Sequence, residues 1–164
     1  MYIHDPLTGL YNRRGFFQIL SGVFAKRETN ASLMVLSIDI DDLKTINDKF
    51  GHLEGDNAIK TVAKALSSIS IRDEICARFG GDEFIVAGVN ESLEYSRQFS
   101  QRFLEFIDYY NKHSDKPYQV VASIGETIGE RKSISSIDEL IAAADFRMYE
   151  QKAAHKTQSR QSNR

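Results

Sequence analysis

Apolar and polar residues follow two different periods along this chain, and these periods predict its strands and helices. Residues 33–38 are almost continuously apolar, which is typical of a strand buried on both faces at the centre of a sheet. Two shorter apolar runs, at 75–77 and 84–89, flank a short turn and predict a β-hairpin. A further strand is expected over residues 118–124.

Five other stretches carry apolar residues at helical spacing. Asn12 is the expected N-cap of the first helix, and Gly51 is expected to end a short second helix. We expect Asp56 to open the third helix and residues 92–114 to form the fourth. A capping box at Ser136 would start the last helix.

The fourth helix would carry an aromatic stripe, which we assign to the hydrophobic core rather than to a stacking platform: Phe99, Phe103, Phe106 and Tyr110. With 164 residues, 41% of them hydrophobic, the chain is long enough for one domain with its own core. Because the end of the chain is polar, we expect the domain to span residues 1–154 and residues 155–164 to be a disordered tail.

Charge and cysteine content exclude several classes of protein. The formal net charge is -2, so no overall basic field favours nucleic acid or an anionic membrane surface as a partner. Cys76 is the only cysteine, which excludes a disulfide within the chain, and its apolar neighbours indicate a buried small residue rather than a nucleophile. No apolar run is long enough for a membrane helix, and the first residues lack the pattern of a signal peptide. We expect a reducing, cytoplasmic setting, with the cytoplasmic part of a membrane-anchored protein as the alternative.

Two acidic segments are the candidate chemistry. Gly80 and Gly81 precede Asp82 and Glu83 in the hairpin turn, and glycine permits positive φ and the close approach of a ligand to the backbone. This turn alone would be interpreted more simply as solvated acids at a hairpin tip.

The second acidic segment, Asp39-Ile40-Asp41-Asp42, follows the expected central strand. Asp39 and Asp41 share one side of a strand, and clustered carboxylates disfavour one another's ionisation. A divalent cation would offset this repulsion, and an all-oxygen ligand set suits Mg²⁺ or Mn²⁺. The alternative is a negatively charged loop after a strand.

The stretch after these acids carries groups suited to a nucleotide. Lys44 lies in the first turn of the short helix, where free N–H groups and a cation can hold phosphate. Asn47 and Asp56 flank the turn at 51–55, and an amide and a carboxylate are suitable partners for the edge of a nucleobase. Each of them alone is more often a cap or turn residue.

Several ordered motifs together resemble the GGDEF domains, the bacterial diguanylate cyclases. They are Asp5 to Arg13, Asp39 to Lys44, Asn47-Asp48, Phe50-Gly51-His52, Gly55-Asp56, Arg78 to Phe84, Ser123-Ile124-Gly125, and Ala144-Asp145 with Tyr149 and Lys152. The resemblance covers essentially the whole chain. It implies an α/β (α+β) fold like the palm of class III nucleotide cyclases, with helices around a mixed, largely antiparallel sheet of about five strands.

The resemblance also implies an activity, the condensation of two GTP into cyclic di-GMP with release of two pyrophosphates. Each domain would hold one GTP, so the enzyme would act as a transient homodimer of GTP-loaded domains. The chain begins almost at the first family motif, so we expect either a stand-alone domain or a piece of a longer protein with a sensory or receiver domain.

Roles for individual residues follow from the same resemblance. Mg²⁺ would be held by Asp39, the carbonyl of Ile40, Asp82 and Glu83, with Asp82 also the candidate general base and Glu83 assisting. The phosphates would be bound by Lys44, the backbone of Asp42 and Leu43, Gly80, Gly81, Lys152 and Lys156. Guanine would be read by Asn47 and Asp56. The Asp56 carboxylate accepts from guanine N1–H and the N2 amino group, which favours GTP over ATP.

Three departures from the family pattern bear on activity. The usual Gly-Arg-Asn after the last lysine motif is replaced by His155, Lys156 and Thr157, and lysine lacks the bidentate fork that arginine offers phosphate. Leu43 stands where phenylalanine is common. The Arg-x-x-Asp inhibitory product site of many members would fall on Ile71 and Glu74. A catalytically weak or silent GTP-binding module is therefore the alternative function, and we expect no product inhibition through that site.

Overall fold

The structure is a computed structural model that describes residues 2–26, 31–130 and 137–162. Within these ranges, helices surround a four-stranded antiparallel sheet whose strand order is β2-β3-β1-β4. In chain order the elements are α1 (Arg13–Ala25), β1 (Ser32–Ile40), α2 (Leu43–Phe50), α3 (His52–Ile69), β2 (Ile75–Gly80), β3 (Glu83–Val89), α4 (Leu93–His113), β4 (Ala122–Glu130) and α5 (Ile137–Ser162).

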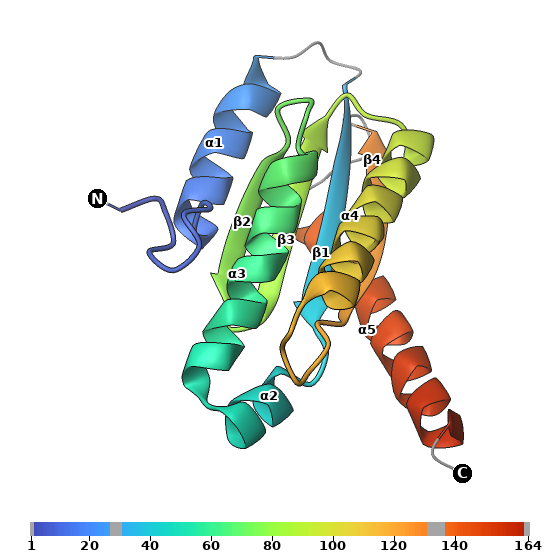
Figure 1. The fold of residues 1–164 in the computed structure, drawn as a ribbon. Helices are drawn as coiled ribbons and strands as arrows, with labels where there is room; N and C mark the ends of the chain where they lie inside the picture. Colours follow the sequence, from blue (N-terminus) through green and yellow to red (C-terminus); the bar gives the residue numbers. More distant parts are fainter. Residues whose placement is uncertain (1, 27–30, 131–136, 163–164) are drawn as a thin grey trace.

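The central strand β1 is buried on both faces, as its apolar run predicts. Met34, Leu36 and Ile38 pack in one hydrophobic cluster with residues of α3 and α4, whereas Leu33 and Val35 pack in a second cluster with residues of α1 and α5. Alternate residues of β1 therefore face different helical layers (Figure 1).

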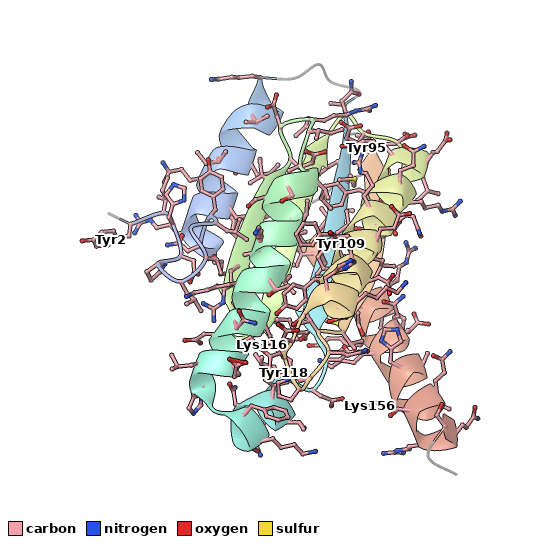
Figure 2. All side chains as sticks on the ribbon, in the orientation of Figure 1. Tyr2, Tyr95, Tyr109, Lys116, Tyr118 and Lys156 are labelled. Atoms are coloured by element: carbon pink, nitrogen blue, oxygen red, sulfur yellow. The ribbon has the colours of Figure 1, made fainter. Side chains whose placement is uncertain are left out.

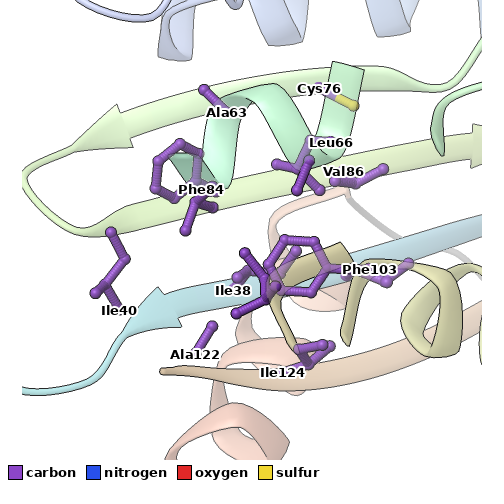
Figure 3. Close-up of a cluster of buried hydrophobic side chains, with 14 of the residues drawn as sticks. Ile38, Ile40, Ala63, Leu66, Cys76, Phe84, Val86, Phe103, Ala122 and Ile124 are labelled. Carbon is purple, nitrogen blue, oxygen red and sulfur yellow. The ribbon is translucent and has the colours of Figure 1, made fainter. Parts of the chain in front are cut away.

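The first of these clusters supports the end of β1 where the acidic segment begins. Ile38 and Ile40 are completely buried, and Figure 3 shows them beside Phe84 of β3 and Phe103 of α4. Ile40 faces this cluster, and successive side chains of a strand point to opposite faces. Asp39 therefore points toward the opposite layer, which contains α5. Burial of Ile38 and Ile40 thus determines which way Asp39 points.

Most expected elements are confirmed. Asn12 caps α1, since its Oδ1 accepts a hydrogen bond of 2.8 Å from the Gly15 N–H. The hairpin lies at β2 and β3, and Gly51 ends α2 with φ of 94°. The aromatic stripe of α4 is core, with Phe99 and Phe103 fully buried. Cys76 is a buried free thiol, and burial raises its pKa to about 11.

Two strand predictions differ from the structure. The described sheet has four strands rather than about five, and all of its strand pairs are antiparallel. The last strand begins at Ala122 rather than Tyr118. Asn111 of α4 explains the late start, because its side-chain amide occupies both backbone groups of Val120, at 2.9 Å to the N–H and 2.8 Å to the carbonyl.

Two helix boundaries also differ. α3 begins at His52 rather than Asp56, and Gly51 alone separates α3 from α2. The Gly51 carbonyl accepts a hydrogen bond of 3.2 Å from the Gly55 N–H, which forms the first turn of α3. α5 continues to Ser162, so the expected disordered tail is helical over the described residues 155–162. The expected capping box at Ser136 lies outside the described residues. Among the helices that the structure describes, none combines the length and apolar character of a membrane span.

Candidate functional site

The candidate site lies at the end of β1, where Asp39 meets α5. Asp39 is paired in register with Glu83 of β3 on one side and with Ser123 of β4 on the other. Its side chain is only 6% exposed, and its Oδ1 lies 3.2 Å from the Nζ of Lys152. The ion pair joins the first acidic residue at the end of the central strand to Lys152 of the last family motif.

Asp82 adds a second carboxyl group beside Asp39. The Ile40 N–H donates to the Asp82 carbonyl at 3.2 Å, which ties the hairpin turn to the end of β1. Burial, and then the neighbouring carboxyl group of Asp82, raise the pKa of Asp39 to about 7, while the charge of Lys152 opposes this rise. The carboxyl groups of Asp39 and Asp82 therefore share the positive charge of Lys152.

The oxygen atoms of Asp39 and Asp82 supply some, but not all, of the ligands that Mg²⁺ prefers. Oδ1 of Asp39 is buried and meets the Lys152 ammonium as an ion pair without a hydrogen bond, so an ion that displaced Lys152 would find this oxygen beside a second carboxylate. Over the ranges that the structure describes, however, no three His, Cys, Asp or Glu side chains are close enough together to hold a metal ion. Further ligands would have to be backbone carbonyls such as that of Ile40, water, or oxygens of a bound phosphate.

The hairpin turn is held by a half-buried arginine, Arg78. Gly80 and Gly81 have φ of 147° and 45°, values that side chains disfavour. Arg78 donates from Nε to the Gly81 carbonyl at 3.0 Å and from Nη1 to Asp5 at 3.1 Å. Burial raises the pKa of Asp5, but the hydrogen bonds from Thr8 and the charge of Arg78 outweigh it, so the pKa lies below 3.8. The opening loop of the chain therefore fixes the turn that carries Asp82.

Glu83 lies on the same side of the site as two other acids. Burial, followed by the negative charges of Asp145 and Asp82, raises its pKa above the ordinary value of 4.5. Asp145, on α5, accepts a hydrogen bond from the hydroxyl of Ser37 on β1. Sequence reasoning assigned no role to Asp145. A carboxylate spaced two helical turns before Lys152 on one face of α5 is the signal that could have found it.

Asn47 lies against Gly55, the residue before Asp56, because α2 packs on α3. An added Cβ at Gly55 would be 1.7 Å from Oδ1 of the Asn47 amide. Asn47 and Asp56 are both half-buried. Lys44 is turned away, since it is 91% exposed and lies 3.8 Å from the Asp48 carboxylate. The structure therefore does not bring Lys44 to Asp39.

Lys152 and Lys156 both line a groove between α2, the segment 117–121 and α5, with a volume of about 620 Å³. The groove also contains Asp41 and Asp42. Figure 2 shows Lys156 on the part of α5 that projects beyond the sheet. The expected phosphate ligands thus divide between this groove and the glycines of the hairpin.

Asp41 has partners that sequence reasoning missed. Its Oδ1 accepts from the Ser123 hydroxyl at 2.7 Å, and its Oδ2 lies 2.7 Å from Nδ1 of His155. Asp41 and Asp39 thus both face α5, which confirms that they share one side of the strand. The spacing of Lys152 and His155, three residues apart on one helical face, is the signal that could have indicated this second contact.

Comparison with known proteins gives consistent matches. The sequence matches the family described as "Diguanylate cyclase, GGDEF domain" over residues 2–158. The diguanylate cyclase VdcA of Vibrio cholerae is 35% identical over 153 residues, which are 92% of this chain and 44% of that protein. The diguanylate cyclase DgcP of Escherichia coli is 34% identical over 151 residues, 90% of this chain and 44% of that protein. The chain therefore spans less than half the length of these two relatives.

A solved structure supports the same assignment. The structure of a sensory box/GGDEF family protein from Caulobacter crescentus superposes with a TM-score of 0.78 at 29% identity, over 93% of this chain and 99% of that chain. The four-stranded antiparallel sheet with its helices is thus the fold of a GGDEF domain. From the family match over residues 2–158 and these relatives, the chain belongs to the GGDEF domain family of diguanylate cyclases.

Proposed function

We propose that this chain is an active diguanylate cyclase domain that condenses two GTP into cyclic di-GMP. The observation that carries the proposal is the convergence of Asp82 on Asp39 beside Lys152, because a buried acid with a pKa of about 7 needs a cation when it ionises. The Vibrio and Escherichia relatives named as diguanylate cyclases support the same chemistry.

In each half-reaction, the ribose 3′-oxygen of one GTP forms a bond to the α-phosphorus of the other, and the bond to the β-phosphate bridging oxygen breaks. Pyrophosphate leaves with the bonding electron pair, and the hydroxyl proton passes to the carboxylate of Asp82. Bound Mg²⁺ would neutralise charge on the phosphate and lower the pKa of the attacking hydroxyl.

The other residues bind and orient the nucleotide. Asp39, Asp82, Glu83 and the Ile40 carbonyl would hold the cation, and Asn47 and Asp56 would bind the guanine edge. Lys152 would leave Asp39 when the cation binds and would then be free for phosphate. Gly80 and Gly81 leave the hairpin backbone open to the nucleotide. Because one domain holds one GTP, two copies would have to face each other.

A GTP-binding module with little turnover is the second candidate. The observation that favours it is Lys156, which is exposed where arginine is usual in the family pattern and makes no ion pair among the described residues. Lysine binds phosphate as a point charge without a planar fork. Weak retention of the triphosphate is the expected consequence.

One experiment distinguishes the two candidates. The protein is incubated with GTP and Mg²⁺ at rising protein concentration, and nucleotides are separated by chromatography. Turnover per monomer that rises with protein concentration supports a cyclase that works as a dimer, whereas bound but unconverted GTP favours the module. Asp82→Asn should lower kcat at least about 100-fold. The matched control Asp108→Asn replaces an exposed acid of α4 and should leave kcat unchanged.

A further inference from the structure

α5 is tied to the end of β1 at two successive points. Lys152 contacts Asp39 at 3.2 Å, and His155 contacts Asp41 at 2.7 Å. Three residues advance about 4.5 Å along a helix, and two residues advance about 6.6 Å along a strand, so alternate strand residues can meet one face of the helix. The second contact extends the first by one helical turn.

Asp41, Ser123 and His155 form a cluster in which each side chain contacts the other two. A carboxylate only accepts hydrogen bonds, so Nδ1 of His155 carries the hydrogen that faces Asp41. The Ser123 hydroxyl donates to the other carboxylate oxygen and lies 3.1 Å from the same ring nitrogen. The Asp41 N–H donates to the Val121 carbonyl at 2.7 Å. Asp41 is thus held by β4, by the segment before it and by α5.

His155 is the last residue of α5 that contacts the rest of the fold through hydrogen bonds or ion pairs, over the described residues. Beyond it, the hydroxyls of Thr157 and Ser162 bond only to carbonyls within the helix. Residues 156–162 are all exposed. An exposed helix end without tertiary hydrogen bonds or ion pairs frays readily, so His155 contributes to how well Lys156 is held.

The same contact fixes the turn that opens α2. Asp42 follows Asp41 directly, has φ of 56°, and makes no side-chain hydrogen bond as the N-cap of α2. The Asp42 side chain therefore does not hold this turn, and the hydrogen bonds of the preceding residue, Asp41, do. Through Asp41, His155 links the turn to α5, and Lys156 lines the groove between the two.

We propose that His155 is a positioning residue that sets the affinity of this chain for the polyphosphate end of its nucleotide. It acts through Asp41, which holds the β1–α2 turn and the outer part of α5 at a fixed separation. Histidine stands here in place of the glycine of the family pattern, so the tie is a feature of this chain. The inference rests on the proposed function, because it concerns the same nucleotide site.

The test compares His155→Ala with His155→Asn, whose amide can donate to Asp41 from nearly the position of Nδ1. The probe is a non-hydrolysable GTP analogue with Mg²⁺, and its Kd is measured by titration calorimetry. His155→Ala should weaken binding about five- to tenfold, less than the loss of a direct hydrogen bond to a charged group, because His155 acts on the nucleotide only through Asp41 and Lys156. His155→Asn should recover most of it. Gln158→Ala, exposed on the same helix, is the matched control and should bind like the wild type.

A coupling measurement separates positioning from general destabilisation. If His155 acts by holding Lys156, then His155→Ala should weaken binding less than twofold once Lys156→Ala is present, a non-additive cycle. Amide hydrogen exchange over residues 153–162 should become faster in His155→Ala and stay unchanged in Gln158→Ala.

Two outcomes would overturn the inference, and they are distinguishable. If the wild type binds the analogue and His155→Ala binds it equally well, the inference is wrong while the proposed function stands. If the wild type binds no analogue, the proposed function fails and the inference fails with it.

Discussion

Nζ of Lys152 lies 3.2 Å from Oδ1 of Asp39, although family resemblance assigns the lysine to phosphate and the aspartate to a metal ion. Burial alone would lower the pKa of Lys152, but the negative charge of Asp39 raises it above its ordinary value. Lys152 therefore supplies the positive charge that the buried carboxylate requires. Binding of a divalent cation would release it toward the nucleotide.

The first prediction tests this pairing directly. Lys152→Met keeps most of the aliphatic stem but removes the charge, so the pKa of Asp39 should rise further above about 7. The measurement is an NMR titration of the Asp39 carboxyl carbon without divalent cations. Lys112→Met, which removes an exposed lysine of α4, is the control. An unchanged Asp39 titration would contradict the pairing.

The second prediction concerns the pH dependence of stability. The pKa of Asp39 is raised from 3.8 to about 7 on folding, so within this window the folded protein binds more protons than the unfolded chain. The contribution of Asp39 to the free energy of unfolding is thus present at low pH and is lost as the pH rises through this window. Urea unfolding with a chelator should show that Asp39→Asn becomes more stable relative to wild type from about pH 4 to about pH 7. A constant difference would exclude the raised pKa.

The third prediction uses two helical glycines. An added Cβ at Gly55 would meet Oδ1 of Asn47 at 1.7 Å, whereas at Gly22 of α1 it would meet nothing within 4 Å. Gly22→Ala should therefore raise the free energy of unfolding by about 0.5–1 kcal/mol, as expected for a helix interior. Gly55→Ala should lack this gain and should weaken binding of a GTP analogue about tenfold, because Asn47 is displaced. Equal binding by the two variants would show that Asn47 does not contact the nucleotide.

The fourth prediction concerns the packing of β4 on α5. A Cβ at Gly125 would lie 2.0 Å from the Ala144 carbonyl oxygen and 2.3 Å from the Met148 nitrogen, both backbone atoms. Since a helix backbone cannot rotate away as a side chain can, Gly125→Ala should lower the free energy of unfolding by at least about 2 kcal/mol. Urea unfolding measures the change. A loss no larger than that of an exposed substitution would mean that α5 shifts easily on the sheet.

The fifth prediction concerns product inhibition. Ile71 is 68% exposed, and the Glu74 carboxylate accepts from the Tyr95 hydroxyl and, at 2.9 Å, from the Arg72 N–H. With no arginine at position 71 and the acid already hydrogen-bonded, we expect no tight cyclic di-GMP binding here. Titration calorimetry measures it, with Arg72→Ala as the comparison. Tight binding that Arg72→Ala abolishes would refute this prediction.

The sequence determined the elements and the two acidic segments. The almost continuous apolar run at 33–38 is typical of a strand buried on both faces, and Asp39 lies at the buried end of that strand. The glycine pair before Asp82 and the aromatic stripe of α4 follow from local geometry in the same way. These features depend on neighbours close in the chain, so one sequence suffices to predict them.

The tertiary structure decided which charges meet. The pairs Lys152–Asp39 and His155–Asp41 depend on where α5 packs on the sheet, and each joins residues more than 100 positions apart. The late start of β4 depends in the same way on where α4 packs. Polar residues at the end of a chain look solvated in a sequence, and only their distance to a buried carboxylate shows otherwise. Long-range packing therefore turned an expected tail into part of the candidate site.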